Sequence, residues 1–600
     1  MNFKNVIRIL LAMLAIPAFA ANGSMKGDGS AQNPFQVEDY EDLKAIGKGS
    51  YLYSSNYILT KDIDASASKK ENCKDGVCNG FTSIGRNKDA VDSTKVWGNF
   101  DGQNHSIRNL FVQWKANNLG LFSNLHGSVK NLKLDSANIT GAINSAGYVG
   151  SVAGYAEGSI ENVHVTNSFV QGSGCVGGIV GYFRKDSMEN VSYQGEVNGI
   201  YRVGGIAGVS NSHIANASAD IRIVAKRDSS SKLSTKQIGG VVGYAEGSVQ
   251  NSRSSGAIIP NTTNISSVGG LVGESRSEIY FCSSSVDLLS VSDSGKTFVF
   301  DNRIGGLVGD NRDPIFYSYA TGNVEGTSSV GGLVGANSNS IRLTYAQGSV
   351  KGQEDVGGLV GLNMAESYGN FHDSGSVEIS YAGNNVIGRE NSGGLVGYNR
   401  VEAERIKDSY WDKELSGLSV SAGGTGLSTK EMMTMSSFVG WDSLGSWIYD
   451  YCDKEPCDGF DTLYNCMCKT DKFFSLWEND EGKSYPYFNK IEDFEGYSGG
   501  VIINETPTVV QNKYVERARS FGAMLQGGSI ALRFEIPTDA SVKFSFVDMQ
   551  GRVVNTADLG RRAAGSYFET LDVVELVRGR YIGVLQVNGK ATEKTMLLKK

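Results

Sequence analysis

An all-β fold is predicted: a parallel β-solenoid of about ten coils, capped at both ends and followed by a small β-sandwich. Three observations predict it. A glycine-centred motif returns at near-regular spacing, an asparagine stands at a fixed place after it, and glycine is abundant, with 76 glycines against 8 prolines in 600 residues. Hydrophobic residues make up 40% of the chain, which is typical of a folded protein.

The motif is clearest at residues 268–273, Val-Gly-Gly-Leu-Val-Gly. The position of its second glycine recurs with gaps of 26 to 36 residues, at 120, 151, 178, 205, 240, 270, 306, 332, 358 and 394. A base period near 26 residues indicates stacked coils of short strands and turns, and the gaps of 35 and 36 residues indicate projecting loops. The glycine pairs permit positive φ or a close approach between the backbones of neighbouring coils.

An asparagine marks a second register of the repeat. It stands 11 or 12 residues after the marker in each of the first five copies, at Asn131, Asn162, Asn190, Asn216 and Asn251. Successive coils of a solenoid lie about 4.8 Å apart, so equivalent side-chain amides can hydrogen-bond along the stack. The spacing therefore predicts an amide ladder at these five positions.

The Gly-Gly-Leu-Val-Gly core resembles the GLUG motif, which occurs in arrays in large bacterial surface and secreted proteins. The resemblance covers residues 116–425, the predicted solenoid. It implies a repeated building unit and no particular chemistry.

The residues before the repeats predict export and an N-terminal cap. Residues 1–20 have the pattern of a secretory signal peptide, with Lys4 and Arg8, then an apolar stretch, then Ala18-Phe19-Ala20 as cleavage site. No later stretch has the roughly 18 apolar residues of a transmembrane helix, so none is expected in the mature chain. Residues 21–115 are interpreted as a capping region, because an open solenoid end exposes unpaired strand edges.

The residues after the repeats divide into three predicted parts. Residues 426–496, rich in cysteine and tryptophan, are interpreted as the C-terminal cap, with Ser428 as the N-cap of a short helix. Residues 497–520 are a linker, and alternating apolar and polar residues predict a β-sandwich over 521–600. Asp548, Gly551-Arg552, residues 579–582 and the basic end 594–600 resemble the C-terminal sorting domain of type IX secretion substrates. The resemblance implies contact with the type IX secretion machinery, and release or anchoring at the outer surface of a Gram-negative-type cell.

Cysteines are expected to form disulfides in an exported chain. The six candidates are Cys73, Cys78, Cys452, Cys457, Cys466 and Cys468, and the last four allow three pairings. Zinc binding is the competing interpretation, but the C-x4-C and C-x-C spacings do not match zinc sites and no histidine is nearby. Cys175 and Cys282 are expected to be buried and unpaired.

The sequence predicts no cofactor, metal site or catalytic residue. A net charge of −8 gives no reason to expect nucleic acid, which calls for a basic stripe. Glu274 and Asp310 take the same place in neighbouring coils, as a glycosidase pair would, and are interpreted as part of a solvated face. The histidines stand at unrelated registers: His105, His126, His164, His213 and His372.

Tyrosines recur at fixed places after the marker and could stack on sugar rings or on one another. Both interpretations stay open for Tyr155, Tyr182, Tyr244, Tyr319, Tyr345 and Tyr398. The leading hypothesis is a secreted, non-catalytic, adhesin-like protein whose solenoid binds an extracellular polysaccharide or other surface polymer. The alternatives are a carbohydrate-active enzyme, a polysaccharide lyase or hydrolase, and a purely structural envelope component.

Overall fold

The computed structural model describes residues 25–86, 94–115, 117–141, 147–226, 235–293, 296–368, 371–439, 441, 445–451, 467–475 and 477–488. Near the C-terminus it describes residues 521–526, 529–536, 539–548, 553–562, 565–572, 579–587 and 590–599. The chain forms two compact units, residues 1–504 and 505–600. The predicted signal peptide and linker lie outside the described residues.

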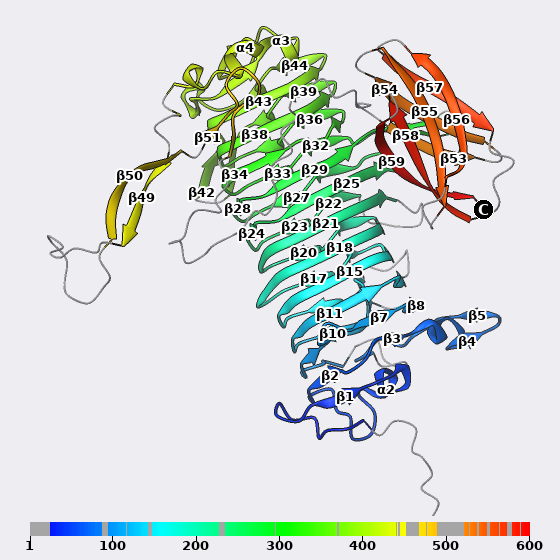
Figure 1. Ribbon diagram of the computed structural model, residues 1–600. Helices are drawn as coiled ribbons and strands as arrows, with labels where there is room; N and C mark the ends of the chain where they lie inside the picture. The colour runs from blue at the N-terminus through cyan, green and yellow to red at the C-terminus, as the bar shows by residue number, and fades with distance from the viewer. Residues whose placement is uncertain are drawn as a thin grey trace, which may run out of the picture. The chain divides into compact units, whose positions relative to one another are not determined.

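The first unit contains the predicted parallel β-solenoid, whose strands stack coil upon coil (Figure 1). Each coil places one short strand before the Gly-Leu pair of the motif and one after it, and these build two ten-stranded parallel sheets. The first motif sheet consists of β9 (Asn118–Leu119), β13 (Tyr148–Val149), β16 (Cys175–Gly177), β19 (Tyr201–Gly204), β22 (Lys236–Gly239), β26 (Ser266–Gly269), β32 (Asn302–Gly305), β36 (Ser328–Gly331), β39 (Glu354–Gly357) and β44 (Glu390–Gly393). The second motif sheet consists of β10 (Phe122–Leu125), β14 (Ala153–Ala156), β17 (Val180–Phe183), β20 (Ala207–Ser210), β23 (Val242–Ala245), β27 (Val272–Ser275), β33 (Val308–Asn311), β37 (Val334–Asn337), β40 (Val360–Asn363) and β45 (Val396–Asn399).

A third sheet closes each coil with longer strands. Its repeat strands are β11 (Val129–Asp135), β12 (Asn138–Gly141), β15 (Ile160–Gln171), β18 (Ser187–Gly199), β21 (His213–Ala225), β24 (Val249–Gln250), β25 (Arg253–Pro260), β28 (Ile279–Tyr280), β29 (Ser283–Leu288), β34 (Ile315–Ala320), β35 (Val324–Glu325), β38 (Ser340–Lys351) and β43 (Ser376–Ile387). Inside the coil, the apolar motif residues Val268, Leu271 and Val272 are fully buried. Full burial of each such side chain contributes about 1.5–3 kcal/mol, so the stacked core stabilises the column.

The motif glycines let two backbones pack face to face. A Cβ on Gly269 would lie 2.0 Å from the carbonyl oxygen of Val272, and one on Gly273 would lie 2.5 Å from that of Gly243. A Cβ on Gly270 would lie 2.0 Å from the carbonyl oxygen of Gly306 in the next coil. Close approach is therefore the reason for the glycines. The expected positive φ is not found at the motif glycines among the described residues.

Positive φ occurs instead near the start of the long strands, at a turn of each coil that we call the corner. The predicted asparagines have φ between 45° and 54° there. In the later coils the same corner position is left-handed with other residue types: Phe281, Tyr317, Leu343, Ile379 and Asp408. A left-handed residue with a Cβ costs roughly 1–2 kcal/mol, and asparagine tolerates it best among non-glycine residues. The corner conformation therefore gives a second reason for the recurring asparagine.

Longer coils carry hairpins, as the surplus spacing predicts. The coil after Gly270 contains β30 (Val291–Asp293) and β31 (Lys296–Phe298), and the coil after Gly358 contains β41 (Ala365–Tyr368) and β42 (Phe371–Ser374).

The N-terminal region extends the stack. β1 (Phe35–Val37), β2 (Tyr57–Leu59) and β6 (Phe100–Asp101) pair in parallel, and β6 pairs with β11. β3 (Ile63–Asp64), β7 (Ser106–Arg108) and β8 (Phe111–Trp114) extend the same long-strand sheet. Helix α2 (Tyr40–Ala45) begins at Asp39, whose Oδ1 accepts from the backbone of Asp42 at 3.0 Å. A short hairpin, β4 (Cys73–Lys74) and β5 (Val77–Cys78), follows the 3-10 turn η1 (Ser66–Lys70).

An aromatic layer covers the flank of the last coils. After η2 (Ala403–Arg405) come β46 (Ile406–Lys407), β47 (Tyr410–Asp412), α3 (Lys413–Ser416), β48 (Thr425–Leu427), α4 (Thr429–Met432), η3 (Met435–Ser437) and the hairpins β49 (Gly445–Tyr451) with β50 (Met467–Ser475) and β51 (Trp477–Glu478) with β52 (Tyr487–Phe488). Ser428 caps α4 in a capping box with Glu431, as predicted. Tyr381 and the three aromatic residues Phe438, Trp441 and Trp477 are at most 1% exposed; we call this the closing cluster.

The second unit contains two antiparallel sheets, consistent with a small sandwich. One consists of β53 (Phe521–Gln526), β54 (Ser529–Ile536) and β57 (Gly565–Asp572); the other of β56 (Val553–Arg562), β55 (Ala540–Asp548), β58 (Gly579–Val587) and β59 (Lys590–Lys599). Val542, Phe544 and Leu585 are fully buried. In the described part of the chain, no helix has the length and apolarity needed to cross a membrane.

Candidate functional site

One row of side chains runs along the second motif sheet, at the residue that directly follows the motif. Strand register places these residues one above another: Asn124, Tyr155, Tyr182, Val209, Tyr244, Glu274, Asp310, Ala336, Leu362 and Tyr398. Facing it, on the first motif sheet, stand left-handed residues that precede the motif valine: Arg202, Gln237, Ser267 and Arg303. We call the space between these two rows the motif cleft.

The centre of the motif cleft is a cavity of about 420 Å³, lined by residues of both motif sheets. A volume of this size is in the range of small-molecule sites. Its lining contains five cationic residues and two acidic ones; the cations are Arg202, Lys236, Arg276, Arg303 and Arg312, and the acids are Glu274 and Asp310. The cavity is therefore polar with an excess of positive charge.

The two acids are buried and held by arginines. Glu274 is 6% exposed and Asp310 is 1% exposed. Arg312 lies between them, with Nε 3.5 Å from Glu274 Oε1 and Nη2 3.1 Å from Asp310 Oδ2. Gln237 Nε2 donates to Glu274 Oε2 at 2.5 Å, and Arg303 also pairs with Asp310. The expectation that these acids belong to a solvated face is wrong, because the facing row encloses them.

Arg312 also ties an inserted hairpin to the cavity. Its Nη1 lies 2.5 Å from Oε2 of Glu366, which is on β41. Burial lowers the pKa of Arg312, but the charges of Asp310, Glu274 and Glu366 outweigh burial and raise that pKa above its ordinary value. The guanidinium is thus a permanent positive charge at the centre of the site.

The rim towards the N-terminus combines a ring with two guanidinium groups. Arg202 lies 4.3 Å and Arg276 5.6 Å from the ring centroid of Tyr244, within cation–π range. Arg202 Nε donates to Gln237 Oε1 at 2.9 Å. Burial, helped by the hydrogen bond to Glu246, raises the pKa of Tyr244 to about 12, so the phenol is neutral at physiological pH.

Aromatic rings continue the motif cleft towards the N-terminal cap. Tyr155 and Tyr182 stack with their centroids 5.7 Å apart, and Tyr148 lies 5.2 Å from Tyr182. His126 lies 6.0 Å from Tyr155 and 4.6 Å from Trp97, whose side chain is 58% exposed. We call these five residues the aromatic strip. Sequence reasoning missed Trp97, His126 and Tyr148 because they lie outside the row after the motif.

Beyond the cavity, towards the C-terminus, the row becomes apolar. Ala336 and Leu362 form a small buried cluster with Met364. Tyr398 ends the row and is 38% exposed, with the Arg400 guanidinium 5.1 Å from its ring centroid.

The remaining two predicted tyrosines lie on another face. Tyr319 and Tyr345 are on the long-strand sheet and stack with their centroids 4.7 Å apart. Tyr345 is 3% exposed, stacks on Tyr381 at 5.1 Å and contacts Trp477 and Phe488. The interpretation of Tyr345 as ligand-facing is wrong, because residues 477–488, which we call the closing segment, cover it. Packing explains this pair, since the partly buried ring of Tyr319 stacks on the buried ring of Tyr345.

Side-chain hydrogen bonds join the predicted asparagines in two separate runs. Asn162 Nδ2 donates to Asn131 Oδ1 at 2.8 Å, Asn190 donates to Asn162 at 3.2 Å, and Asn251 donates to Asn216. No bond between the described side chains of Asn190 and Asn216 connects the two runs.

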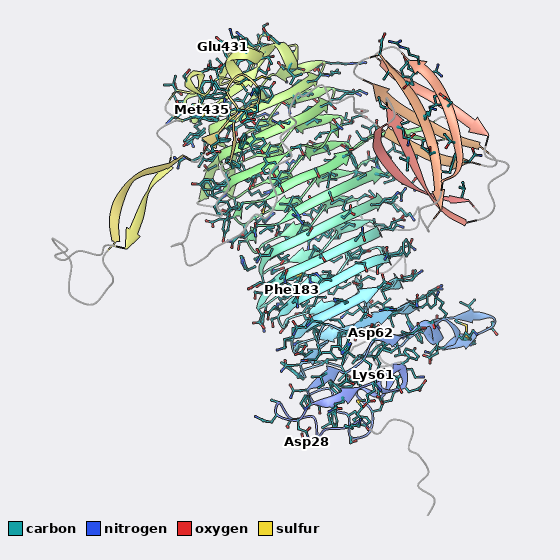
Figure 2. All side chains as sticks on the ribbon, viewed as in Figure 1. Asp28, Lys61, Asp62, Phe183, Glu431 and Met435 are labelled. Carbon is teal, nitrogen blue, oxygen red and sulfur yellow. A yellow bond between two sulfur atoms is a disulfide. The ribbon has the colours of Figure 1, made fainter. Side chains whose placement is uncertain are left out.

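A second amide ladder lies inside the solenoid. Asn311 donates to Asn337 at 2.9 Å, Asn337 to Asn363 at 2.9 Å and Asn363 to Asn399 at 3.0 Å. Phe183 fills the equivalent inward position of an early coil and is labelled in Figure 2. The signal in the sequence was present, as Val-Gly-x-Asn in four successive coils.

The cysteine predictions divide by region. Cys73 and Cys78 form a disulfide that closes the β4–β5 hairpin. Cys175 and Cys282 are buried free thiols. Cys452, Cys457 and Cys466 lie outside the described residues, as does the side chain of Cys468 on β50. Among described residues, no group of three or more His, Cys, Asp or Glu side chains is placed to hold a metal ion.

Comparisons with known proteins identify the repeat. The family model described as the GLUG motif matches residues 234–259. Over 158 residues, 26% of this chain and 2% of the relative, the chain is 36% identical to halomucin of Haloquadratum walsbyi (strain DSM 16790 / HBSQ001). The chain thus corresponds to a very small part of that relative. A solved IgA1 protease is similar at 17% identity over 62% of this chain and 21% of that one, with a TM-score of 0.26, which carries no functional argument. The chain is a β-solenoid repeat protein, and its residues 234–259 match the GLUG motif.

Proposed function

We propose that this chain is a secreted, surface-displayed and non-catalytic protein that binds an extended polysaccharide along the motif cleft. The observation that carries the proposal is the continuity of the cleft: Tyr155 and Tyr182 of the aromatic strip lie on the same stacked row as Glu274 and Asp310 of the charged cavity. Stacked coils repeat the same surface along one direction, which suits a polymer that makes several weak contacts at once.

Trp97, Tyr148, Tyr155 and Tyr182 of the aromatic strip supply the surface on which sugar rings stack, whereas the side chain of His126 is only 2% exposed. An aromatic face is apolar and fits the C–H face of a sugar, while a phenol or indole edge supplies hydrogen bonds. Trp97 is the most accessible member, and Lys95 Nζ lies 5.6 Å from its ring centroid. The Trp97 side chain is 58% exposed, so much of its apolar area is still in contact with water. Burial of that area against a ligand would contribute favourable free energy to binding.

A carbohydrate-active enzyme is the second candidate, because Glu274 and Asp310 are stacked acids in a cavity. Glycoside hydrolysis needs one carboxylic acid that donates a proton and one carboxylate that acts as base or nucleophile. Here both carboxylates already accept hydrogen bonds from arginine side chains, Glu274 from Arg276 and Asp310 from Arg312, so these oxygens are engaged within the protein. The arrangement suits binding better than proton transfer.

Display outside the cell rests on the sequence. The first twenty residues have a secretory pattern, and residues 521–600 resemble a type IX sorting domain, which we propose addresses the chain to that machinery. The similarity to halomucin, whose name describes a mucin-like protein, fits an extracellular setting.

The test is binding of the mature full-length chain to a panel of soluble polysaccharides by affinity electrophoresis, with reducing-sugar release as the readout for cleavage. Trp97→Ala is expected to weaken binding about tenfold, since loss of one stacking ring removes about 1–1.5 kcal/mol. Leu52→Ala is the matched control, because Leu52 is also in the N-terminal region and is 56% exposed against 58% for Trp97. Equal binding by wild type and Trp97→Ala, or cleavage abolished by Glu274→Gln, would overturn the proposal.

A further inference from the structure

The charged cavity has cations that its own acids do not neutralise. Arg303 and Arg312 pair with Asp310, and Arg276 Nε lies 3.1 Å from Glu274 Oε1. Within the described residues, the remaining two lining cations, Arg202 and Lys236, form no salt bridge with a carboxylate and instead lie over tyrosine rings. These two charges stand on the rim of the cavity, where a ligand enters.

Asp310, which lines the same cavity, has one buried oxygen without a hydrogen-bond partner among the described residues. Its Oδ2 accepts from Arg303 and Arg312, but its Oδ1 is buried and has no hydrogen-bond partner among the described residues. A buried carboxylate oxygen without a donor costs free energy, so a ligand hydroxyl that donates to it would be stabilised. Asp310 is 1% exposed, so the site is built into the fold and is not a loose surface patch.

We propose that this cavity is a subsite for an acidic sugar residue, and that it binds the carboxylate or sulfate of that residue through Arg202 and Lys236. The inference rests on the proposed function and names its ligand class. A guanidinium offers parallel N–H donors that match the oxygens of either anion, and an ammonium adds a point charge. A hydroxyl of the same sugar donates to Asp310 Oδ1.

The charge of the rest of the chain makes the subsite selective. The net charge of −8 repels a polyanion from most of the surface. Attraction is therefore confined to places where cations are concentrated, and the cavity lining has five cations against two acids. Arg312 and Glu366 hold the wall of the cavity in place, which limits the reorganisation that binding needs.

The experiment compares pairs of polymers with the same backbone, one charged and one neutral. Polygalacturonate is compared with its methyl ester, and dextran sulfate with dextran, on the mature full-length chain by affinity electrophoresis at two salt concentrations. We expect at least one charged polymer to bind about tenfold more tightly than its neutral partner, with the preference reduced by added salt. The two pairs distinguish a carboxylate from a sulfate ligand.

Variants locate the binding to the cavity. Arg202→Gln and Lys236→Gln are each expected to remove most of the preference for the charged polymer, measured as the ratio of its affinity to that of the neutral polymer. Arg400→Gln is the matched control, because Arg400 also lies over a tyrosine ring, Tyr398, but at the far end of the row. Unchanged melting temperatures show that the variants fold.

Two results would overturn the subsite. One is equal binding of charged and neutral polymers, and the other is a charge preference that Arg202→Gln and Lys236→Gln retain. In both cases the proposed function stands if Trp97→Ala still weakens polymer binding, because that variant tests the aromatic strip and not the cavity. If no polymer binds, the proposed function fails and the subsite fails with it.

Discussion

Removal of one amide from the inner ladder gives a sharp test of how the solenoid is held together. Asn337 is the centre of that ladder: its Oδ1 accepts from Asn311, and its Nδ2 donates to Asn363. Asn337→Ala leaves the Nδ2 donor of Asn311 and the Oδ1 acceptor of Asn363 without these partners. All three asparagines are 0% exposed, so water does not replace the lost bonds without entering the core.

The expected cost is worked from these two buried side-chain groups; the bonds between the Asn337 side chain and the Asn339 backbone are lost as well. Each buried polar group without a partner costs about 1–3 kcal/mol, so the free energy of unfolding should fall by about 2–6 kcal/mol. Asn399→Ala is the control, because Asn399 ends the ladder and Asn363 is its one ladder partner among the described residues. Its side chain also bonds the backbone of Val401, as that of Asn337 bonds the backbone of Asn339, so this loss is common to both variants. The Nδ2 of Asn363 keeps an acceptor in the carbonyl of Gly375 at 3.1 Å, so this variant should lose only about 0.5–1.5 kcal/mol.

Urea unfolding followed by far-ultraviolet circular dichroism measures both variants against wild type. The midpoint should shift further for Asn337→Ala than for Asn399→Ala, with the slope unchanged. If the two variants agree within about 0.5 kcal/mol, buried amide pairing does not stabilise the column as argued.

Three further predictions concern other parts of the first unit. Gly309→Ala should lower the free energy of unfolding by at least about 3 kcal/mol or prevent folding, because its Cβ would lie 2.5–2.6 Å from backbone atoms of the preceding coil. Gly417→Ala is the control: it has open space and φ +70°, so it should cost only about 1–2 kcal/mol. Thermal melting measures both variants. Hydrogen bonding by Tyr155, with Lys185 and His126 nearby, lowers the pKa of Glu157 from 4.5 to about 2, so the stability that Glu157 contributes is present above pH 4.5 and is lost as the pH falls towards 2. The melting temperature of Glu157→Gln should therefore vary less with pH over that window than that of wild type. Parallel melting curves of the two proteins against pH would contradict this assignment. Tyr381→Phe removes a 2.7 Å hydrogen bond to the Pro486 carbonyl and should lower the free energy of unfolding by about 1–3 kcal/mol. Tryptophan fluorescence during unfolding measures this change. An unchanged unfolding transition would show that this bond does not hold the closing segment.

The repeat was predictable because its cause is local. Residues 268–273 contain both the glycines that allow two strands to approach and the apolar residues that fill the coil, so one short motif specifies strand, turn and core. The corner asparagines were found by spacing, but their left-handed backbone was not, since a periodic residue can reflect either backbone conformation or side-chain bonding.

The cavity was not predictable because its members meet only through coil stacking and an inserted hairpin. Arg312 and Glu366 are 54 residues apart in sequence and 2.5 Å apart in space. The register of Glu274 and Asp310 was visible in the sequence, whereas their burial depends on Gln237 and Arg303 of the facing row. Tyr345 shows the same difficulty, because a segment more than 100 residues later covers it.

The left-handed corner divides the column into two kinds of repeat. Early coils place asparagine there, whereas Phe281, Tyr317, Leu343 and Ile379 bring bulky apolar side chains to the same point. Phe281 stacks on Tyr317, and Tyr317 contacts Phe488 of the closing segment. Early coils could therefore be duplicated or lost with little change at their outer corner, lengthening or shortening the array. A later coil could not be gained or lost in this way without changing the aromatic contacts that join these coils to the closing segment.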